Sequence, residues 1–327
     1  MIPMTSRERF RETMCYGRPD RVPYFEEGIR QDVLEAWRSQ GLPTGADLSL
    51  MFPTDRREEI QLDLDPYPPF RKWPTSHSEL GEWRRRLDPG DVRRLPEDWP
   101  RCVTAWQVRT HVLMLRVHSG FFISMGVDDW RRFTEVIYLL NDDPRFVRKA
   151  MAMQGDFAAS LAEQVLRQVR VDAAVFSEPI GGNDRPLMSP QMYEDLVLRS
   201  YEPVLDVLRQ YEVDTIILRT YANARVLLPS ILKWGFNCLW ACEVNLEAMD
   251  YRALRRAFGR GLRLIGGIDL DVLRDGKGAI RRELEEKVPA LLADGGYVPL
   301  ADGRVRADVP FENYVFYRQL LQELTQT

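Results

Sequence analysis

The chain is poor in the residues that cross-link small proteins or hold metals. Its 327 residues include four cysteines and three histidines. The cysteines are too few and too scattered for a disulfide framework: Cys15, Cys102, Cys238 and Cys242. Cys238 and Cys242 fall on one predicted strand, and no histidine stands in a ligand-like spacing to them. We interpret both as small core residues, and we predict no metal site and no cofactor.

Long apolar runs and a strong net charge are also missing. No run approaches the roughly 18 apolar residues that a membrane-spanning helix requires. The net charge is −4, with 45 basic and 49 acidic residues spread along the chain, so we expect neither a membrane nor a nucleic-acid partner. The N-terminal residues MIPMTSRERF lack an apolar segment after a basic start, so no signal peptide is expected. A reduced, cytoplasmic location is the default prediction.

The clearest pattern in the sequence lies in the stretch Val213–Asp269. Three short apolar runs alternate there with two segments of helical length. The runs are Thr215–Leu218, Phe236–Ala241 and Leu262–Ile265, and the intervening segments are Arg225–Trp234 and Leu246–Phe258. Short apolar strands that alternate with helices predict a parallel sheet buried on both faces.

The same alternation continues over most of the chain and predicts an α/β fold. Eight strands are expected, at 22–27, within 56–64, and at 112–117, 173–177, 214–218, 236–241, 262–266 and 296–300. After the first third, helices separate them. Because a (β/α)8 TIM barrel takes about 250 residues or more, we predict a single barrel domain that spans residues 1–327.

Residues 47–100 differ from the remainder in composition. Eight of the 21 prolines fall in this range, at positions 53, 66, 68, 69, 74, 89, 96 and 100. Proline cannot donate to a strand ladder and is excluded from helix interiors, so we predict irregular or short-stranded structure. We interpret the range as an insertion over one end of the barrel, either a lid or a surface excursion without function.

Charged and polar residues follow several predicted strands. In parallel α/β proteins the carboxyl ends of the strands face the ligand. Carboxylates there can act as general acids or bases, and the planar fork of arginine suits a substrate carboxylate. As catalytic residues we predict Glu178, Tyr221 and Glu243, and as substrate-binding residues Arg219, Arg30, His118, Asp269, Asp302 and Arg304. The alternative is that these groups form internal ion pairs that hold loops, and that His118 is a loop histidine.

Seven segments of the chain together form a recognisable pattern: Thr5–Phe10, Pro19–Pro23, Ser189–Met192, Leu264–Asp269, Lys287–Pro289, Gly295–Pro299 and Asp308–Tyr314. This pattern resembles the uroporphyrinogen decarboxylase superfamily. The resemblance covers nearly the whole chain and is most specific in the C-terminal half. It implies a (β/α)8 barrel with its site in the cleft at the carboxyl ends of the strands. The nearest branch is decarboxylase-like and also contains corrinoid-linked methyltransferases.

The departures from this family are as informative as the match. The arginine motif R-Q-A-G-R of true uroporphyrinogen decarboxylases is absent, and only Arg30-Gln31 follows the first predicted strand. The zinc motif H-x-C of the methyltransferases falls on Arg219-Thr220-Tyr221, and their last thiol ligand falls near Gly303. Zinc activation of a thiol is therefore not expected there. Glu178 and Glu243 match acids that are usual in this branch.

Three functional hypotheses remain open on the sequence. The first is a uroporphyrinogen decarboxylase-like carboxy-lyase that is metal-free and uses acid/base chemistry. Its arginines would hold an anionic small molecule or tetrapyrrole, and an acid or Tyr221 would move the proton. The second is a corrinoid-linked methyltransferase, which would need a corrinoid protein as partner. The third is a non-catalytic ligand-binding barrel. The family contains dimers, so a homodimer is an open alternative.

Overall fold

The computed structural model describes residues 3–242 and 249–326. The chain divides into two compact units. The central unit comprises Glu58–Arg109 and Leu113–Asn237, and the terminal unit comprises Met1–Arg57, Thr110–Val112 and Cys238–Thr327. Each unit has its own set of strands and helices. No helix among the described residues is long and apolar enough to cross a membrane.

The strands of the central unit follow one another in the sheet in chain order. They are β1 (Arg57–Gln61), β2 (Val112–His118), β3 (Ala173–Glu178) and β4 (Ile216–Tyr221). Strands β2, β3 and β4 pair in parallel. The helices are α4 (Leu80–Arg86), α5 (Trp99–Gln107), α6 (Phe121–Ser124), α7 (Trp130–Asp142), α8 (Pro144–Leu166), α9 (Pro190–Tyr193), α10 (Arg199–Gln210) and α11 (Leu228–Lys233).

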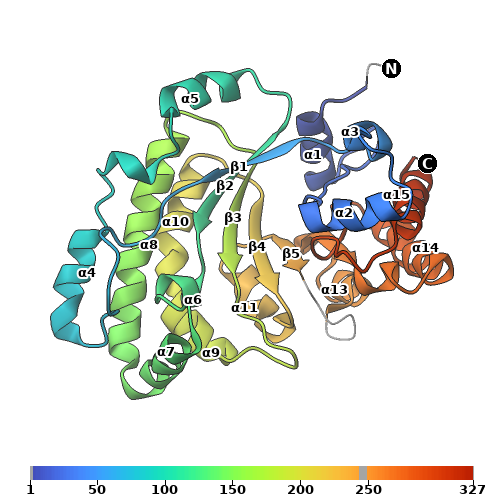
Figure 1. Cartoon of the computed structure of the whole chain (residues 1–327). Helices are drawn as coiled ribbons and strands as arrows, with labels where there is room; N and C mark the ends of the chain where they lie inside the picture. Colours follow the sequence, from blue (N-terminus) through green and yellow to red (C-terminus); the bar gives the residue numbers. More distant parts are fainter. Residues whose placement is uncertain (1–2, 243–248, 327) are drawn as a thin grey trace. The chain divides into compact units, whose positions relative to one another are not determined.

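Helices α8 and α10 lie side by side along β2, β3 and β4 (Figure 1). Their buried side chains include Phe157 and Leu161 of α8 and Leu205 and Leu208 of α10. The segment Ala173–Phe176 is fully buried, which explains why this strand reads as an uninterrupted apolar run. The parallel α/β fold class predicted from the sequence is therefore confirmed for this unit.

The terminal unit repeats this arrangement with three parallel strands in chain order. They are β5 (Cys238–Cys242), β6 (Arg263–Ile268) and β7 (Tyr297–Ala301). The helices are α1 (Ser6–Met14), α2 (Gln31–Ser39), α3 (Leu48–Met51), α13 (Tyr251–Phe258), α14 (Lys277–Asp294) and α15 (Phe311–Thr325). Trp37 of α2 is fully buried in the core, and its indole nitrogen donates to the backbone carbonyl of Val309 at 2.8 Å.

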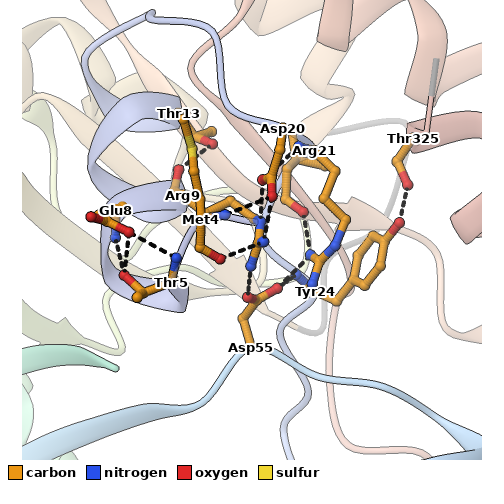
Figure 2. A network of polar contacts seen from close by, with 11 residues as sticks. Met4, Thr5, Glu8, Arg9, Thr13, Asp20, Arg21, Tyr24, Asp55 and Thr325 are labelled. Atoms are coloured by element: carbon orange, nitrogen blue, oxygen red, sulfur yellow. Dashed lines mark hydrogen bonds and ion pairs between the residues drawn. The ribbon is translucent and has the colours of Figure 1, made fainter. Parts of the chain in front are cut away.

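A buried ionic network fixes the start of the chain within the terminal unit (Figure 2). Thr5 and Glu8 form the capping box at the head of α1 that their spacing predicts. Arg9 donates to Asp20 at 2.7 Å and also contacts Asp55, and Arg21 donates to Asp55 at 2.6 Å. The hydrogen bond from Arg9 is the main reason that the pKa of Asp20 is lowered to about 2. The network explains why acidic and basic residues stand close together in the sequence at Asp20 and Arg21.

The predicted strand at residues 22–27 is not formed, and this prediction was wrong. The amide of Tyr24 donates to the Asp55 carboxylate at 2.7 Å, and the carbonyl of Tyr24 accepts from the amide of Asp55 at 2.8 Å. The backbone of this segment is thus satisfied by a distant aspartate instead of a strand ladder. The described residues contain seven strands, not the eight expected.

The proline-rich range 47–100 is less irregular than its composition indicates. It holds α3, β1 and α4 and the start of α5. Helix α4 forms in Leu80–Arg86, which contains no proline, and Pro100 occupies the first turn of α5, where its missing amide hydrogen is tolerated. The prolines therefore separate short elements and do not prevent them. The role of this range as a lid or insertion stays a prediction.

Candidate functional site

The residues near the ends of β3 and β4 point to two different faces of the sheet. Ser177 pairs in register with Arg219, and Glu178 pairs with Thr220. Because successive residues of a strand point to opposite faces, Arg219 and Glu178 lie on opposite sides. We use "helix face" for the side of Glu178, which α9 and α10 contact, and "basic face" for the side of Arg219. The two predicted groups are therefore not neighbours in one row.

Glu178 is completely buried on the helix face and is enclosed by hydrogen-bond donors. One carboxylate oxygen, Oε1, accepts from the amide of Phe121 at 2.9 Å. The other, Oε2, accepts from the hydroxyl of Tyr193 at 3.2 Å and from the hydroxyl of Tyr201. Burial raises the pKa of Glu178 to about 7, although all three donors act to lower it. This carboxyl can exchange its proton near neutral pH, but it has no exposed surface.

His118 belongs to the same buried cluster. The register of β2 against β3 shifts between Arg116 and His118, so that His118 pairs with Phe176 and shares the face of Glu178. Its ring lies 4.5 Å from the ring of Tyr201, and its Nδ1 accepts from the amide of Gly120 at 2.9 Å. Burial lowers the pKa of His118 to about 3, so the ring is neutral at physiological pH. In this structure His118 supports the Glu178 cluster.

On the basic face, Arg219 is held by a residue of β1. Its Nη1 and Nη2 donate to the two carboxylate oxygens of Glu59 at 2.9 and 3.1 Å. The side chains are 15% and 11% exposed, so water screens the pair weakly. In a flat sheet β1 and β4 would lie about 14 Å apart, three strand spacings. The contact therefore requires these strands to curve, with the basic face on the concave side.

Arg116 and Tyr221 also lie on the basic face. Arg116 of β2 pairs in register with Val175, two residues before Ser177, so it points to the same side as Arg219. Tyr221 stands two residues after Arg219 at the end of β4 and is 40% exposed. Arginine side chains and a phenol on one concave surface are suited to hold an anion and to transfer a proton.

Among the described residues, four of the predicted site residues belong to the terminal unit. Asp269 follows β6 and Asp302 follows β7, as the sequence predicts, and Asp302 accepts from the amide of Leu270 at 3.0 Å. Burial raises the pKa of Asp269. Arg304 is exposed, and Arg30 is half exposed with a 3.4 Å contact to Asp32. Roles for these four residues in substrate binding stay predictions, and Glu243 lies outside the described residues.

Sequence reasoning missed three residues that define these clusters. Glu59 lies within residues 56–64, where a strand was expected without exact bounds. Nothing in the neighbouring sequence indicates that an acid of β1 contacts Arg219. Tyr193 and Tyr201 stand eight residues apart around a π-helical turn, Glu194–Leu198, and both reach Glu178. Their spacing places them on one side of a helix, which is a signal that the sequence does contain. Two tyrosines eight residues apart that follow a strand ending in an acid are therefore a pattern that indicates a buried carboxyl of this kind.

Comparison with known proteins gives distant relatives. No family model matches the chain. It is 23% identical over 200 residues to the uroporphyrinogen decarboxylase of Legionella pneumophila (strain Paris), a match that covers 60% of this chain and 53% of that protein. The protein of strain Corby gives the same values. The chain thus spans about half the length of the curated relatives it matches, and the similarity suggests a uroporphyrinogen decarboxylase-like superfamily.

Proposed function

We propose that the chain is a carboxy-lyase of the uroporphyrinogen decarboxylase type that acts on a carboxylate-bearing small molecule or tetrapyrrole. The observation that carries this proposal is the grouping of Arg116, Arg219 and Tyr221 on one concave face. The distant similarity to uroporphyrinogen decarboxylases supports the same class of reaction. We also propose that the parallel strands belong to a (β/α)8 barrel, as the resemblance implies.

The reaction follows from what these side chains can do. The bond between the substrate carbon and its carboxylate breaks, CO2 leaves, and the electron pair remains on the carbon and is delocalised into an electron-withdrawing part of the substrate. Fixed positive charge on the basic face stabilises the negative charge that develops. The Tyr221 hydroxyl donates a proton to that carbon, and solvent returns the proton to the phenolate. No step in this sequence requires Glu178 to touch the substrate.

Release of CO2 tests the proposal. We would assay the full chain with uroporphyrinogen III and with pyrrole-3-acetate, a small molecule with the same acetate on a pyrrole ring. Tyr221→Phe should lower kcat by about 100-fold or more, because a general acid contributes factors of that order, and should leave KM nearly unchanged. Tyr138→Phe is the matched control, since Tyr138 is also exposed but lies on α7. Equal kcat in the Tyr221→Phe variant and the wild type would remove Tyr221 from the mechanism.

A further inference from the structure

We propose that Arg116 is the group that receives the substrate carboxylate, while Glu59 neutralises Arg219 and makes it a fixed part of the site. This inference rests on the proposed function and specifies which arginine binds the anion. The assignment comes from the ion pair between Glu59 and Arg219 and from the position of Arg116 on the basic face.

The contacts of Arg219 indicate that its charge is already compensated. Glu59 occupies both terminal nitrogens in a two-pronged arrangement, which is the geometry that a substrate carboxylate would adopt. A carboxylate that bound Arg219 would have to displace a largely buried acid, and the displaced Glu59 would then repel it. The pair as a whole is neutral, so it offers an incoming anion little net attraction.

Arg116 presents the opposite situation. Among residues 3–242 and 249–326 it makes no hydrogen bond and no ion pair, and its Nε is buried without a partner. Arg116 acts electrostatically on Asp65: burial raises the pKa of Asp65, the charge of Asp63 adds to the rise, and the charge of Arg116 opposes it. Buried donors in folded proteins are nearly always satisfied. Because no acceptor among the described residues reaches the Arg116 guanidinium, we infer that it is open to an anion from outside the chain.

The neighbours of Arg116 make a carboxylate the fitting anion. A guanidinium offers a planar donor fork, and a carboxylate matches it with two oxygens. Tyr221 lies on the same face, four residues beyond the level of Arg116 in the strand register, so a substrate held by Arg116 would share this surface with a proton donor. The neutral Glu59–Arg219 pair would border the site and fix its width.

Calorimetric titration of the full chain with tricarballylate, a flexible tricarboxylate, tests this assignment. Arg116→Gln should weaken binding by about 10- to 100-fold, the loss expected for hydrogen bonds to a charged group. Arg116→Lys keeps the charge but loses the fork and should give an intermediate loss. The double variant with Glu59→Gln and Arg219→Gln should weaken binding by no more than about 3-fold, because the neutral pair is replaced by neutral amides.

Controls separate this inference from the proposed reaction. Arg131→Gln removes an arginine of the same unit that is 78% exposed, and it should leave binding unchanged. Wild-type affinity in the Arg116→Gln variant would overturn the assignment, as would a loss of binding in the double variant equal to that in Arg116→Gln. Absence of tricarballylate binding by the wild type would also overturn it. Binding through Arg116 without CO2 release from any tested substrate would keep the anion site and remove the decarboxylase proposal.

Discussion

The two faces of β2, β3 and β4 carry ionisable groups in different environments. On the helix face, Glu178 is fully buried and its carboxylate is satisfied by three donors. On the basic face, Arg219 is paired with Glu59, and Arg116 makes no hydrogen bond or ion pair among the described residues. The comparison shows that a polar residue at a strand end is not by itself a site residue. What distinguishes Arg116 from both Glu178 and Arg219 is that no acceptor among the described residues satisfies its guanidinium.

The largest expected effect comes from breaking the ion pair on the basic face. Arg219→Ala should lower the free energy of unfolding by about 3–5 kcal/mol, because it leaves the largely buried Glu59 carboxylate with a hydrogen bond from Gln61 but without its ion-pair partner. Urea unfolding measures this difference. The double variant with Glu59→Gln and Arg219→Gln should lose much less. If the single and double variants were equally destabilised, the pair would not act as a unit.

The buried Glu178 on the helix face should make the free energy of unfolding depend on pH. The ordinary pKa of a glutamate is 4.5, whereas that of Glu178 is raised to about 7, so between these values the folded chain holds a proton that the unfolded chain has lost. Stability from this group is complete below pH 4.5 and declines by about 3 kcal/mol as the pH rises through 7. Glu178→Gln should remove this decline, measured by urea unfolding at pH 5 and 7.5. An unchanged pH dependence in the variant would place the pKa of Glu178 near its ordinary value.

A smaller effect is expected at Gly120, which lets the backbone pass close to Glu178. Its φ is +85°, and a methyl carbon there would lie 2.5 Å from the carbonyl oxygen of Ser177. Gly120→Ala should therefore destabilise the chain by the positive φ and by the clash, about 2 kcal/mol or more. Gly235→Ala is the matched control, since Gly235 has φ +101° and no atom within 4 Å of the added carbon. It should cost about 1 kcal/mol. Thermal unfolding measures both losses. Equal decreases in melting temperature for the two variants would show that the backbone at Gly120 is less closely packed against Glu178 than described.

The sequence predicted the elements well where the determinants are local. The capping box of Thr5 and Glu8 and the strands that end before Asp269 and Asp302 were found because a few neighbouring residues specify them. The strand expected at 22–27 failed because Asp55, about 30 residues away, takes over the hydrogen bonds of Tyr24. Local patterns contain no information about such a partner.

The candidate site was predictable only in part, for a related reason. The sequence showed which residue types stand at the strand ends. The face of the sheet to which each side chain points depends on the register of the paired strands, which the sequence does not show. The register shift between Arg116 and His118 moves His118 to the helix face, and no sequence pattern predicts this shift. The pairing of Glu59 with Arg219 depends on the curvature of the strands, which is a property of the assembled sheet.

A crystal structure of the chain with bound tricarballylate would test the account most directly. We predict that one carboxylate of the probe lies within hydrogen-bond distance of the Arg116 guanidinium, with Glu59 still bound to both terminal nitrogens of Arg219. A probe carboxylate seated on Arg219 in place of Glu59, or bound beside Glu178, would contradict it.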